Sequence, residues 1–403
     1  MRSRLRIEKL VYGGSGLARH GDTTVFVPLV LPGEEVEVEL PAQASRIERR
    51  PPIAWISRSP ERCEPPCPVF GQCGGCHYQH FEYERECELK VQILRETLRR
   101  IGGLDWEGDI RVVAGSPWRY RNRTRIRLAR RSEGWSAGFF ASGSHRHVGV
   151  GECTINSPKL NELHRCLQRI PAGRRLPKRF RTLDFFTDEE QVQLDLPRQR
   201  GPLPNWFRGL CLDCLGIDRA VKPLVYQCGP DSFRVSRRSF FQVNRFLADK
   251  LAGLAIGSAE GRLALDLYCG VGLISLPLAR KFQSVVGVDS SAPAVRDLRS
   301  NAARASLAVR AVRMEVGAFL EDVSDRPDLV VADPPRAGLG GAVVEQLLRV
   351  SAPQLHVVSC DPATLARDIK GLVAGGYRVR ELALIDFFPQ TYHIESVAML
   401  ARE

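Results

Sequence analysis

Two residues near the end of this 403-residue chain have side chains suited to covalent chemistry. Cys360 lies in the segment Ser-Cys-Asp-Pro, at the end of an expected strand, and Glu395 lies on a later strand. A thiolate can attack an electrophilic carbon, and a carboxylate can then remove a proton from the adduct. We therefore predict that Cys360 is a nucleophile and Glu395 a base. A buried, unreactive cysteine is the alternative interpretation of Cys360.

A second motif, Asp266-Leu-Tyr-Cys-Gly-Val-Gly, joins an expected strand to an expected helix. This arrangement is typical of nucleotide sites, but Ser275 replaces the third glycine of the dinucleotide fingerprint. Asp289 ends the next expected strand, where its carboxylate can accept hydrogen bonds from ribose hydroxyls. S-Adenosylmethionine fits this loop, because it carries a ribose and no pyrophosphate. A purely structural turn is the alternative.

The elements that must position these residues alternate between strands and helices from about residue 239 onward. We expect strands at 262–268, 284–289, 328–333 and 356–360, and helices at 276–282, 292–304, 343–351 and 363–373. Alternation with apolar strands predicts an α/β, doubly wound sheet. The carboxyl ends of its parallel strands share one edge, so Asp333 and Cys360 should face the same crevice.

The first 57 residues indicate a different unit. Short alternating strands broken by glycine and proline turns predict a five-stranded barrel of the OB type, a frequent oligonucleotide binder. A barrel with only a structural role is the alternative. A helix is expected at 83–101, with its apolar face at Leu89, Ile93, Leu94, Leu98 and Ile101. Residues 111–235 are mostly β in pattern.

These patterns divide the chain into three units. Residues 1–57 form the barrel, 58–85 with 110–235 form a central β domain, and 86–109 with 236–403 form the α/β domain. The chain shows neither a secretory signal pattern nor an apolar run of about 18 residues, so we expect a cytoplasmic protein with no membrane contact. Its 12 cysteines are then ligands, catalytic thiols or core residues and not disulfides.

Charge and its distribution favour a polyanionic partner. The net charge is +12, and nucleic acid is the first candidate. Five arginines alternate along one stretch and would share one face of a strand: Arg119, Arg121, Arg123, Arg125 and Arg127. We predict that they contact RNA phosphates. A solvated edge strand is the alternative, and a second basic loop spans residues 174–181.

Three cysteines cluster in the pattern Cys67-x5-Cys73-x2-Cys76, and Cys153 is the candidate fourth ligand. Thiolates in such a set can hold zinc or an iron–sulfur cluster. Cys63 is a competing ligand within reach, and unligated thiols are a further alternative. Cys211 and Cys214 also form a C-x2-C pair, but without partners we expect them to pack in a core.

The order of motifs along the chain is specific. It runs through Phe240-Phe-Gln-Val-Asn, the loop at Asp266, Asp333-Pro-Pro-Arg-Ala-Gly, Ser359-Cys-Asp-Pro-Ala-Thr-Leu-Ala-Arg-Asp and Ile394-Glu-Ser-Val. This order resembles the RNA uracil-5-methyltransferases, in the version with an N-terminal TRAM domain and an iron–sulfur cluster. The resemblance covers nearly the whole chain. It implies a class I methyltransferase domain and a TRAM barrel.

The resemblance also implies roles for residues. Cys360 would add to uracil C6, C5 would accept the methyl group of S-adenosylmethionine, and Glu395 would remove the C5 proton. Cofactor contacts would come from Gln242, Tyr268, Gly270, Asp289 and Asp333, and a 4Fe–4S cluster would be held by Cys67, Cys73, Cys76 and Cys153. The sequence departs from the family at Tyr268, where phenylalanine is usual, at Leu273, where a polar residue often contacts the cofactor, and at Gln390, where histidine is frequent.

We expect a monomer that extrudes its target uridine, because a thiolate cannot reach C6 inside a base stack. Ribosomal RNA of the large subunit, 23S rRNA, is the preferred substrate and transfer RNA the alternative. Two other classes stay open. A radical adenosylmethionine enzyme can combine a barrel with a cluster, but it uses a C-x3-C-x2-C pattern. A non-catalytic RNA-binding protein would not need both Cys360 and Glu395.

Overall fold

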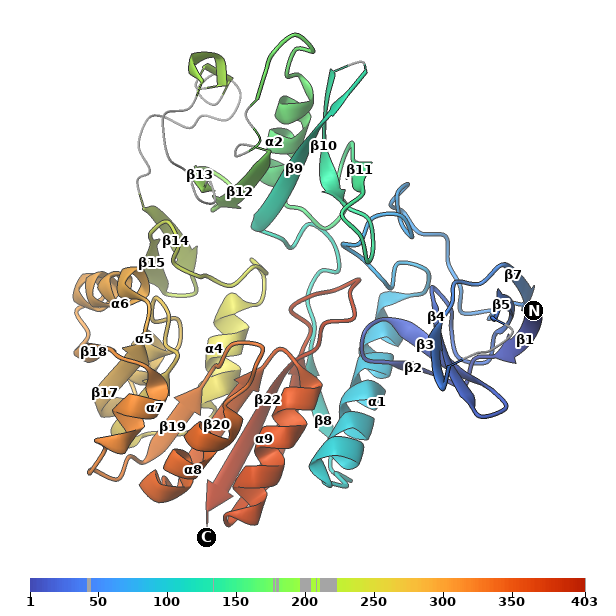
Figure 1. The fold of residues 1–403 in the computed structure, drawn as a ribbon. Helices are drawn as coiled ribbons and strands as arrows, with labels where there is room; N and C mark the ends of the chain where they lie inside the picture. The colour runs from blue at the N-terminus through green and yellow to red at the C-terminus, as the bar shows by residue number, and fades with distance from the viewer. Residues whose placement is uncertain are drawn as a thin grey trace.

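The computed structural model describes residues 1–41, 45–132, 134–176, 178, 181–195, 204–207, 209–210 and 223–402. Three bodies are visible in Figure 1: an α/β layer structure, an N-terminal β unit beside it, and a β-rich region above the sheet. Among the described residues, no helix has both the length and the apolar character that crossing a membrane requires.

An eight-stranded sheet forms the centre of the α/β domain, in the order β18-β17-β16-β19-β20-β22-β21-β8. The strands are β8 (Ile110–Val113), β16 (Gly261–Leu267), β17 (Phe282–Asp289), β18 (Val309–Arg313), β19 (Leu329–Ala332), β20 (Gln354–Ser359), β21 (Tyr377–Ile385) and β22 (Glu395–Arg402). Only β22 runs antiparallel to its neighbours, between β20 and β21. The doubly wound α/β sheet predicted from the sequence is confirmed, as a mixed sheet.

Two differences from the sequence prediction concern the ends of elements. Strand β8 pairs in parallel with β21, so residues 110–113 lie in the α/β sheet although the boundary expected at 109 leaves them outside it. The helix expected at 276–282 is only a short α5 (Ser275–Leu278), because β17 already begins at Phe282. Strand β8 has only four residues, so its pattern does not show which sheet it joins, and β17 begins two residues before the strand expected at 284–289.

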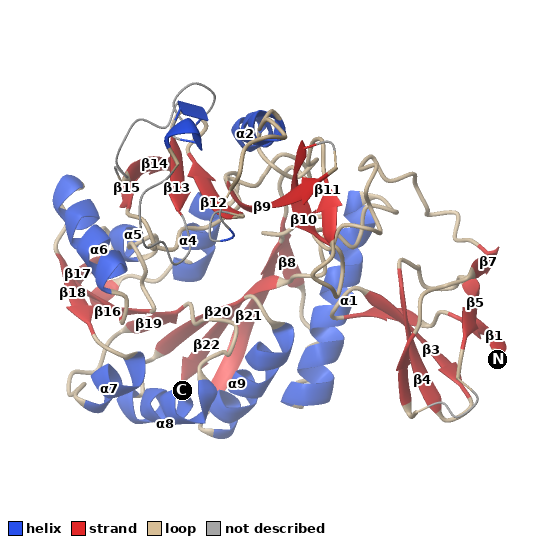
Figure 2. Cartoon of the chain, turned by 45° about the horizontal axis from the view of Figure 1, so that its top comes forward, coloured by secondary structure: helices blue, strands red, loops and turns tan. Residues whose placement is uncertain are grey.

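Helices cover both faces of the sheet (Figures 1 and 2). One face carries α1 (Tyr83–Gly102), α7 (Val316–Glu321), α8 (Gly340–Val350) and α9 (Pro362–Ala374), and the other carries α4 (Ala248–Ile256), α5 and α6 (Ala292–Arg304). On α1, Leu89, Ile93, Leu94 and Leu98 are buried as expected, but Ile101 is 45% exposed. Ile101 lies in the last turn, where left-handed Gly103 ends the helix at the rim of the core.

The N-terminal unit consists of two small sheets around one apolar core. One sheet contains β1 (Arg2–Arg6), β5 (Glu35–Glu39) and β7 (Ala54–Ser57). The other contains β2 (Lys9–Val11), β3 (Ser15–His20), β4 (Thr23–Pro28) and β6 (Ile47–Arg49). Alternate residues of β1 and β5 point inward, which is the pattern that predicted a barrel. The described part therefore has seven short strands where the sequence suggested five.

The central region contains a five-stranded antiparallel sheet in the order β11-β10-β9-β12-β13. Its strands are β9 (Arg123–Arg131), β10 (Gly134–Phe140), β11 (His147–Gly149), β12 (Thr182–Thr187) and β13 (Val192–Asp195). Helix α2 (Pro158–Gln168) packs against this sheet, and the hairpin of β14 (Leu224–Cys228) and β15 (Asp231–Val235) leads back to the α/β domain. This region lies over the carboxyl ends of the parallel strands (Figure 1).

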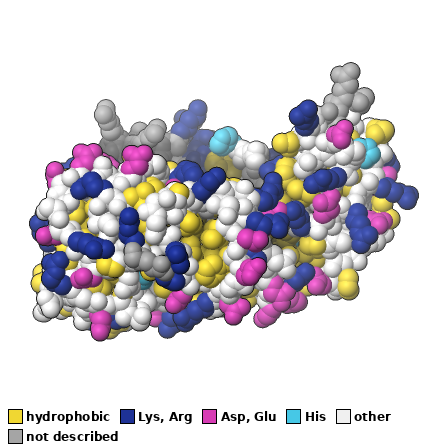
Figure 3. Space-filling view, turned by 90° about the horizontal axis from the view of Figure 1, so that it is seen from below, with side chains coloured by type: hydrophobic (Ala, Val, Ile, Leu, Met, Phe, Trp, Pro, Cys, Tyr) yellow, Lys and Arg dark blue, Asp and Glu magenta, His cyan; other side chains and the backbone are white. Residues whose placement is uncertain are grey.

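The side of the molecule turned away from this region has a mixed surface. Figure 3 shows Lys and Arg interspersed with Asp and Glu over that face, with apolar side chains between them. Positive charge is therefore not gathered there. Of the basic residues singled out by the sequence, Arg121, Arg125, Arg127 and Lys178 instead line a cleft between the bodies.

Candidate functional site

The candidate nucleophile and base meet at the carboxyl edge of the sheet. Cys360 follows β20 directly, and Glu395 is the first residue of the neighbouring strand β22. Ser359 pairs with Ser396 in the antiparallel ladder, so Cys360 and Glu395 are the next residues beyond that pair. Asp361 then caps α9, with its Oδ1 accepting hydrogen bonds from Ala363 N at 2.9 Å and Thr364 N at 3.2 Å. The thiol is thereby held on a fixed strand-to-helix turn.

Burial controls the electrostatics of this site. It raises the pKa of the Cys360 thiol to about 11, with a further contribution from the negative charge of Glu395, while Arg336 opposes the shift. The resting side chain is therefore a thiol. Because the thiolate is the attacking species, the Cys360 thiol must lose its proton for the reaction to proceed.

Two carboxyl groups share the same enclosed space. Burial raises the pKa of Asp333 to about 7. Burial also raises the pKa of Glu395 well above its ordinary value, the charge of Asp333 raises it further, and Arg336 lowers it. Two close carboxylates cannot both ionise easily, so the pair is expected to share a proton near neutral pH. A carboxyl group that holds a proton well is suited to accept one from carbon.

The nucleotide loop lies at the point where the sheet changes winding direction, between β16 and β19. Open α/β sheets bind ligands at this crevice. Tyr268 and Gly270 both have left-handed backbone conformations, with φ of 62° and 54°, so the loop turns sharply at the end of β16. Asp289 fixes the loop, because its Oδ2 accepts from Gly270 N at 3.0 Å and its Oδ1 from Ser291 N at 2.7 Å.

The residues here fit an adenosyl cofactor. Asp289 is only partly buried and each of its oxygens keeps a free lone pair for a hydroxyl donor. Asp266 is fully buried with Oδ1 lacking a partner, and burial raises its pKa to about 7. Asp333 N donates to Leu267 O at 3.2 Å, which places Asp333 beside the loop. The structure thus brings four of the predicted cofactor residues to one edge: Tyr268, Gly270, Asp289 and Asp333.

The fifth predicted residue, Gln242, reaches this edge from the connection after β15. Its neighbour Phe241 packs in one apolar cluster with Cys269 and Val271 of the loop. Gln242 is 8% exposed, and its carbonyl accepts from Asn122 Nδ2 at 3.1 Å. Leu273, the departure from the family pattern, packs partly buried against the apolar cores. Its role is therefore accounted for by packing.

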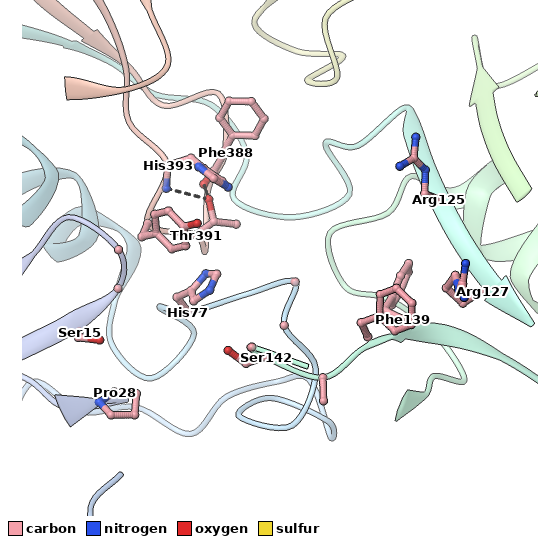
Figure 4. A pocket seen from close by; sticks show the side chains of 18 of the residues that line it. Ser15, Pro28, His77, Arg125, Arg127, Phe139, Ser142, Phe388, Thr391 and His393 are labelled. Atoms are coloured by element: carbon pink, nitrogen blue, oxygen red, sulfur yellow. Dashed lines mark hydrogen bonds between the residues drawn. The ribbon is translucent and has the colours of Figure 1, made fainter. Parts of the chain in front are cut away.

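A cleft of about 1350 Å³ opens where the three bodies meet. In Figure 4, Ser15 and Pro28 of the N-terminal unit lie on one side, His77, Thr391 and His393 lie together, and Arg125 and Arg127 project from β9 on the far side. The segment after β21 lines one end of the cleft through residues 388 and 391–393, and we call it the catalytic end because it leads into Glu395, although neither Cys360 nor Glu395 lines the cleft itself. The cleft therefore connects all three bodies to the turn that carries the candidate base.

Aromatic rings line the catalytic end of this cleft. The ring of Tyr392 lies 4.6 Å from that of His77, 4.4 Å from that of His393 and 5.6 Å from that of Tyr12. Burial lowers the pKa of His77 to about 4 and that of His393 to about 3, so both rings are neutral. Sequence reasoning gave these residues no role, since aromatic residues distant in sequence leave no common pattern.

The arginine stripe is only partly a strand. Strand β9 begins at Arg123, so Arg119 and Arg121 precede it, and Arg119 has a left-handed φ of 54°. The residues that alternate with the arginines, 120, 122, 124, 126 and 128, are buried. Strand β9 lies in the middle of its sheet, between β10 and β12, which contradicts the alternative of an edge strand.

The five arginines also differ in their partners. Arg121, Arg125 and Arg127 line the cleft. Arg125 pairs with Asp184 at 2.7 Å but its side chain stays 66% exposed, and Arg127 lies over the ring of Phe140. Arg123 is instead largely buried against Phe186 and donates to Ser239 O at 3.3 Å. Arg123 therefore has a structural explanation that does not need RNA.

The four candidate cluster cysteines line one small cavity of about 50 Å³: Cys67, Cys73, Cys76 and Cys153. Burial raises the pKa of Cys153 to about 11, and that of Cys73 and Cys76 also rises. Among the described residues, however, no group of three or more His, Cys, Asp or Glu side chains is arranged closely enough to hold a metal ion. The predicted cluster is thus not supported by a preformed ligand set, although the thiol chemistry fits it.

The remaining cysteines are accounted for separately. Cys63 does not line this cavity, and its Sγ lies 3.7 Å from Gln79 O. Cys211 and Cys214 lie outside the described residues. In the basic loop at 174–181, Lys178 lines the cleft, while Arg179 lies outside the described part of the chain.

A buried charge cluster anchors the catalytic end of the cleft to α1. Lys90 Nζ lies 2.7 Å from both Glu86 Oε1 and Asp386 Oδ1 and donates to Phe388 O at 3.2 Å. Gln390, the second departure from the family pattern, donates its backbone N–H to Glu86 at 2.8 Å and has a left-handed φ of 67°. Residues 386–390 are therefore held by backbone and charge contacts.

Comparison with known proteins places these features in a family. The family model described as tRNA (uracil-5-)-methyltransferase matches residues 229–403. An uncharacterized RNA methyltransferase of Aquifex aeolicus is 33% identical, with 98% of each chain covered. The 23S rRNA (uracil(1939)-C(5))-methyltransferase of Pectobacterium atrosepticum is also 33% identical, over 97% of this chain and 91% of that protein.

A solved structure agrees in fold along the whole chain. The Pyrococcus abyssi tRNA (uracil-54, C5)-methyltransferase, in complex with S-adenosyl-L-homocysteine, has a TM-score of 0.74 and 24% identity, with both chains fully covered. These matches exclude the radical enzyme and the non-catalytic binding protein. With its class I sheet, its nucleotide loop and the meeting of Cys360 and Glu395, this chain belongs to the RNA uracil-5-methyltransferase family.

Proposed function

We propose that the chain methylates C5 of a uridine in 23S rRNA, with Cys360 as nucleophile and Glu395 as base. The observation that carries this proposal is that Cys360 and Glu395 lie next to each other at the ends of β20 and β22, on the sheet edge that also carries the nucleotide loop. S-Adenosylmethionine, when bound, supplies an electrophilic methyl group. The other requirements fall on the protein, because uracil C5 is too weak a nucleophile to accept that methyl group directly.

The first step is addition. The Cys360 thiol loses its proton to solvent, and its sulfur forms a bond to uracil C6, which pushes the C5–C6 electron pair onto C5 and O4. The raised pKa of this thiol means that a free thiolate is rare, so the reaction depends on bringing C6 into contact with the sulfur. C5 would then take the methyl group from the sulfonium sulfur, and the bond between that sulfur and the methyl carbon would break to leave S-adenosyl-L-homocysteine.

The second step is elimination. Glu395 removes the proton from C5, the electron pair restores the C5–C6 double bond, and the bond between C6 and Cys360 sulfur breaks. Burial beside Asp333 raises the pKa of Glu395, which favours this proton transfer from carbon. Asp333, with its pKa near 7, can hold the uracil edge by accepting or donating a hydrogen bond.

The cofactor side of the site is formed by the five residues predicted from the sequence: Gln242, Tyr268, Gly270, Asp289 and Asp333. Asp289 would accept hydrogen bonds from the ribose, and the sharp loop at Tyr268 and Gly270 leaves room above the end of β16. An added Cβ at Gly270 would meet no atom within 4 Å, so this space is open.

RNA would occupy the cleft between the three bodies. Arg121, Arg125 and Arg127 would meet phosphates, while Arg119 is exposed at the end of the same segment. The aromatic rings near Tyr392 offer stacking surfaces for bases around an extruded uridine. A 23S rRNA target is favoured by the relatives named for that substrate, which match over nearly the full length.

The four cysteines would hold a 4Fe–4S cluster with a structural role. Cys67, Cys73 and Cys76 come from the segment before α1, and Cys153 comes from the central region, so a shared cluster would link them. The methyl transfer itself needs no electron transfer. We propose that the chain acts as a monomer of three units, with the boundaries given above and β8 assigned to the methyltransferase domain.

The test is methyl transfer to defined RNA. Purified protein should place 5-methyluridine in an unmodified 23S rRNA transcript, and the Cys360→Ala variant should retain less than a few per cent of the activity. Cys228→Ala, at a partly buried cysteine on β14, is the matched control and should stay active. Methylation of a tRNA transcript in preference to rRNA would overturn the substrate assignment, and activity in Cys360→Ala would overturn the mechanism.

A further inference from the structure

The tip of an N-terminal hairpin reaches the turn that carries the candidate nucleophile. Tyr12 follows β2, and the turn at Gly13 and Gly14, with φ of 102° and 81°, leads into β3. The Tyr12 hydroxyl donates a hydrogen bond to the backbone carbonyl of Cys360 at 3.4 Å. A residue near the start of the chain thus contacts the backbone of the nucleophile itself.

The Tyr12 ring also packs against residues of the α/β domain. It meets the ring of Tyr392 edge to face, with centroids 5.6 Å apart and planes at 90°. Both rings pack against the main apolar core of the methyltransferase domain. Gly14 lets the turn approach closely, because an added Cβ would lie 3.2 Å from His77. Lys9, on β2, also forms an ion pair with Glu96 of α1.

We propose that Tyr12 is a positioning residue for Cys360, so that the N-terminal unit orients the nucleophile as well as binding RNA. The hydroxyl fixes the last carbonyl before the α9 cap at Asp361, and the ring fixes Tyr392. Burial raises the pKa of Tyr12, and so do the negative charge of Asp361 and a hydrogen bond that the hydroxyl shares with that carboxylate on the same turn, so the hydroxyl keeps its proton. This inference rests on the proposed role of Cys360.

The position of the Tyr12 hydroxyl predicts different effects on the reaction rate and on RNA affinity. The Tyr12 ring lines the cleft, but its hydroxyl contacts the turn and not the arginines at the far side, so loss of the hydroxyl alone should change the reaction rate more than RNA affinity. If the turn were more mobile, the Cys360 sulfur would be aligned with uracil C6 for a smaller fraction of the time. Losing one ordinary hydrogen bond corresponds to a decrease of about 3- to 10-fold in rate.

The test uses Tyr12→Phe in the full-length protein, which keeps the ring and removes the hydroxyl. RNA carrying 5-fluorouridine at the target position traps the Cys360 adduct, because the base cannot remove fluorine from C5. We expect a rate of adduct formation about 3- to 10-fold below wild type under saturating RNA, with unchanged RNA affinity and melting temperature. Tyr12→Leu, which also loses the ring contact, should be slower still.

Tyr78→Phe is the matched control, because the Tyr78 hydroxyl is buried and has no hydrogen-bond partner in the structure. Its adduct rate should equal that of wild type. A wild-type rate in Tyr12→Phe, or a loss confined to RNA affinity, would overturn the positioning role. Cys360→Ala tests the two proposals separately. If this variant still forms the adduct, Cys360 is not the nucleophile. If it forms none, the rate of Tyr12→Phe alone decides the role of Tyr12.

Discussion

Replacing Lys90 by methionine tests the buried charge cluster that anchors the catalytic end of the cleft. The side chains of Lys90 and Glu86 are 0% exposed and that of Asp386 is 1% exposed. Methionine keeps most of the length and packing of lysine but removes the charge and three hydrogen-bond donors. Two buried carboxylates would then face each other without a cation, and Phe388 O would lose its donor.

The cost follows from that burial. Removing one partner of a buried ion pair typically costs about 3–5 kcal/mol, because the remaining charge is left uncompensated. Domain stabilities are about 5–15 kcal/mol, so Lys90→Met should fold at low temperature with a clearly lowered unfolding midpoint. Glu86→Gln removes one carboxylate and leaves Lys90 paired with Asp386, so its cost should be smaller. Adding Glu86→Gln to Lys90→Met should restore part of the loss.

The pH dependence gives a second check on Lys90→Met. Burial and Asp386 raise the pKa of Glu86, and Lys90 opposes that rise in the wild type. Without Lys90 the pKa rises further, so the folded state binds protons more readily than the unfolded state. Stability from such a group is present at low pH and lost as pH rises through the folded pKa. Because burial already raises the pKa of Glu86 to about 8 in the wild type, the two proteins differ in protonation mainly above that pH, and the deficit of the variant should be smaller at about pH 7 than at about pH 9.

Urea unfolding followed by circular dichroism measures both effects. Lys250→Met on α4 is the control, because Lys250 is 62% exposed and pairs with Asp249 at 3.4 Å. An exposed pair of this kind contributes about 0–1 kcal/mol. A loss below about 1 kcal/mol in Lys90→Met, with no dependence on pH, would refute the interpretation of residues 86, 90 and 386 as a buried charge cluster.

The reaction and the RNA contacts give further tests. Glu395→Gln should trap a covalent RNA adduct that depends on Cys360, seen as a slow band on denaturing gels; undiminished product without an adduct would place the base elsewhere. Adduct formation by wild type should rise with pH, by about tenfold per unit below the thiol pKa of about 11, and a flat profile between about pH 6 and 8.5 would contradict the raised thiol pKa. Protein purified without oxygen should contain about four irons and Cys76→Ser should lose them; stoichiometric zinc instead would refute the cluster. Neutralising Arg125 and Arg127 should reduce the salt slope of RNA binding by roughly 0.7 for each lost phosphate contact, and an unchanged slope in a folded variant would remove β9 from the RNA surface.

The sequence alone determined the features that are encoded locally. Alternating apolar strands and helices specified the α/β sheet, and the strand ends at Asp289, Asp333 and Cys360 specified which residues share its carboxyl edge. This works because parallel strands joined by helices place their carboxyl ends together whatever their spatial order. The period-two pattern around β9 likewise predicted that alternate arginines share one face, although not that β9 is a central strand.

Only the tertiary structure decided how distant segments meet. Glu86 and Lys90 lie on the apolar face of α1, and only their neutralisation with Asp386, about 300 positions later in the chain, explains their burial. The contact of Tyr12 with Cys360 spans 348 positions, and the ring that it touches, Tyr392, has no sequence pattern in common with it. Such contacts form only when whole domains pack together through apolar surfaces and ion pairs. Sequence periodicity reports which face of an element is buried, but not what that face is buried against.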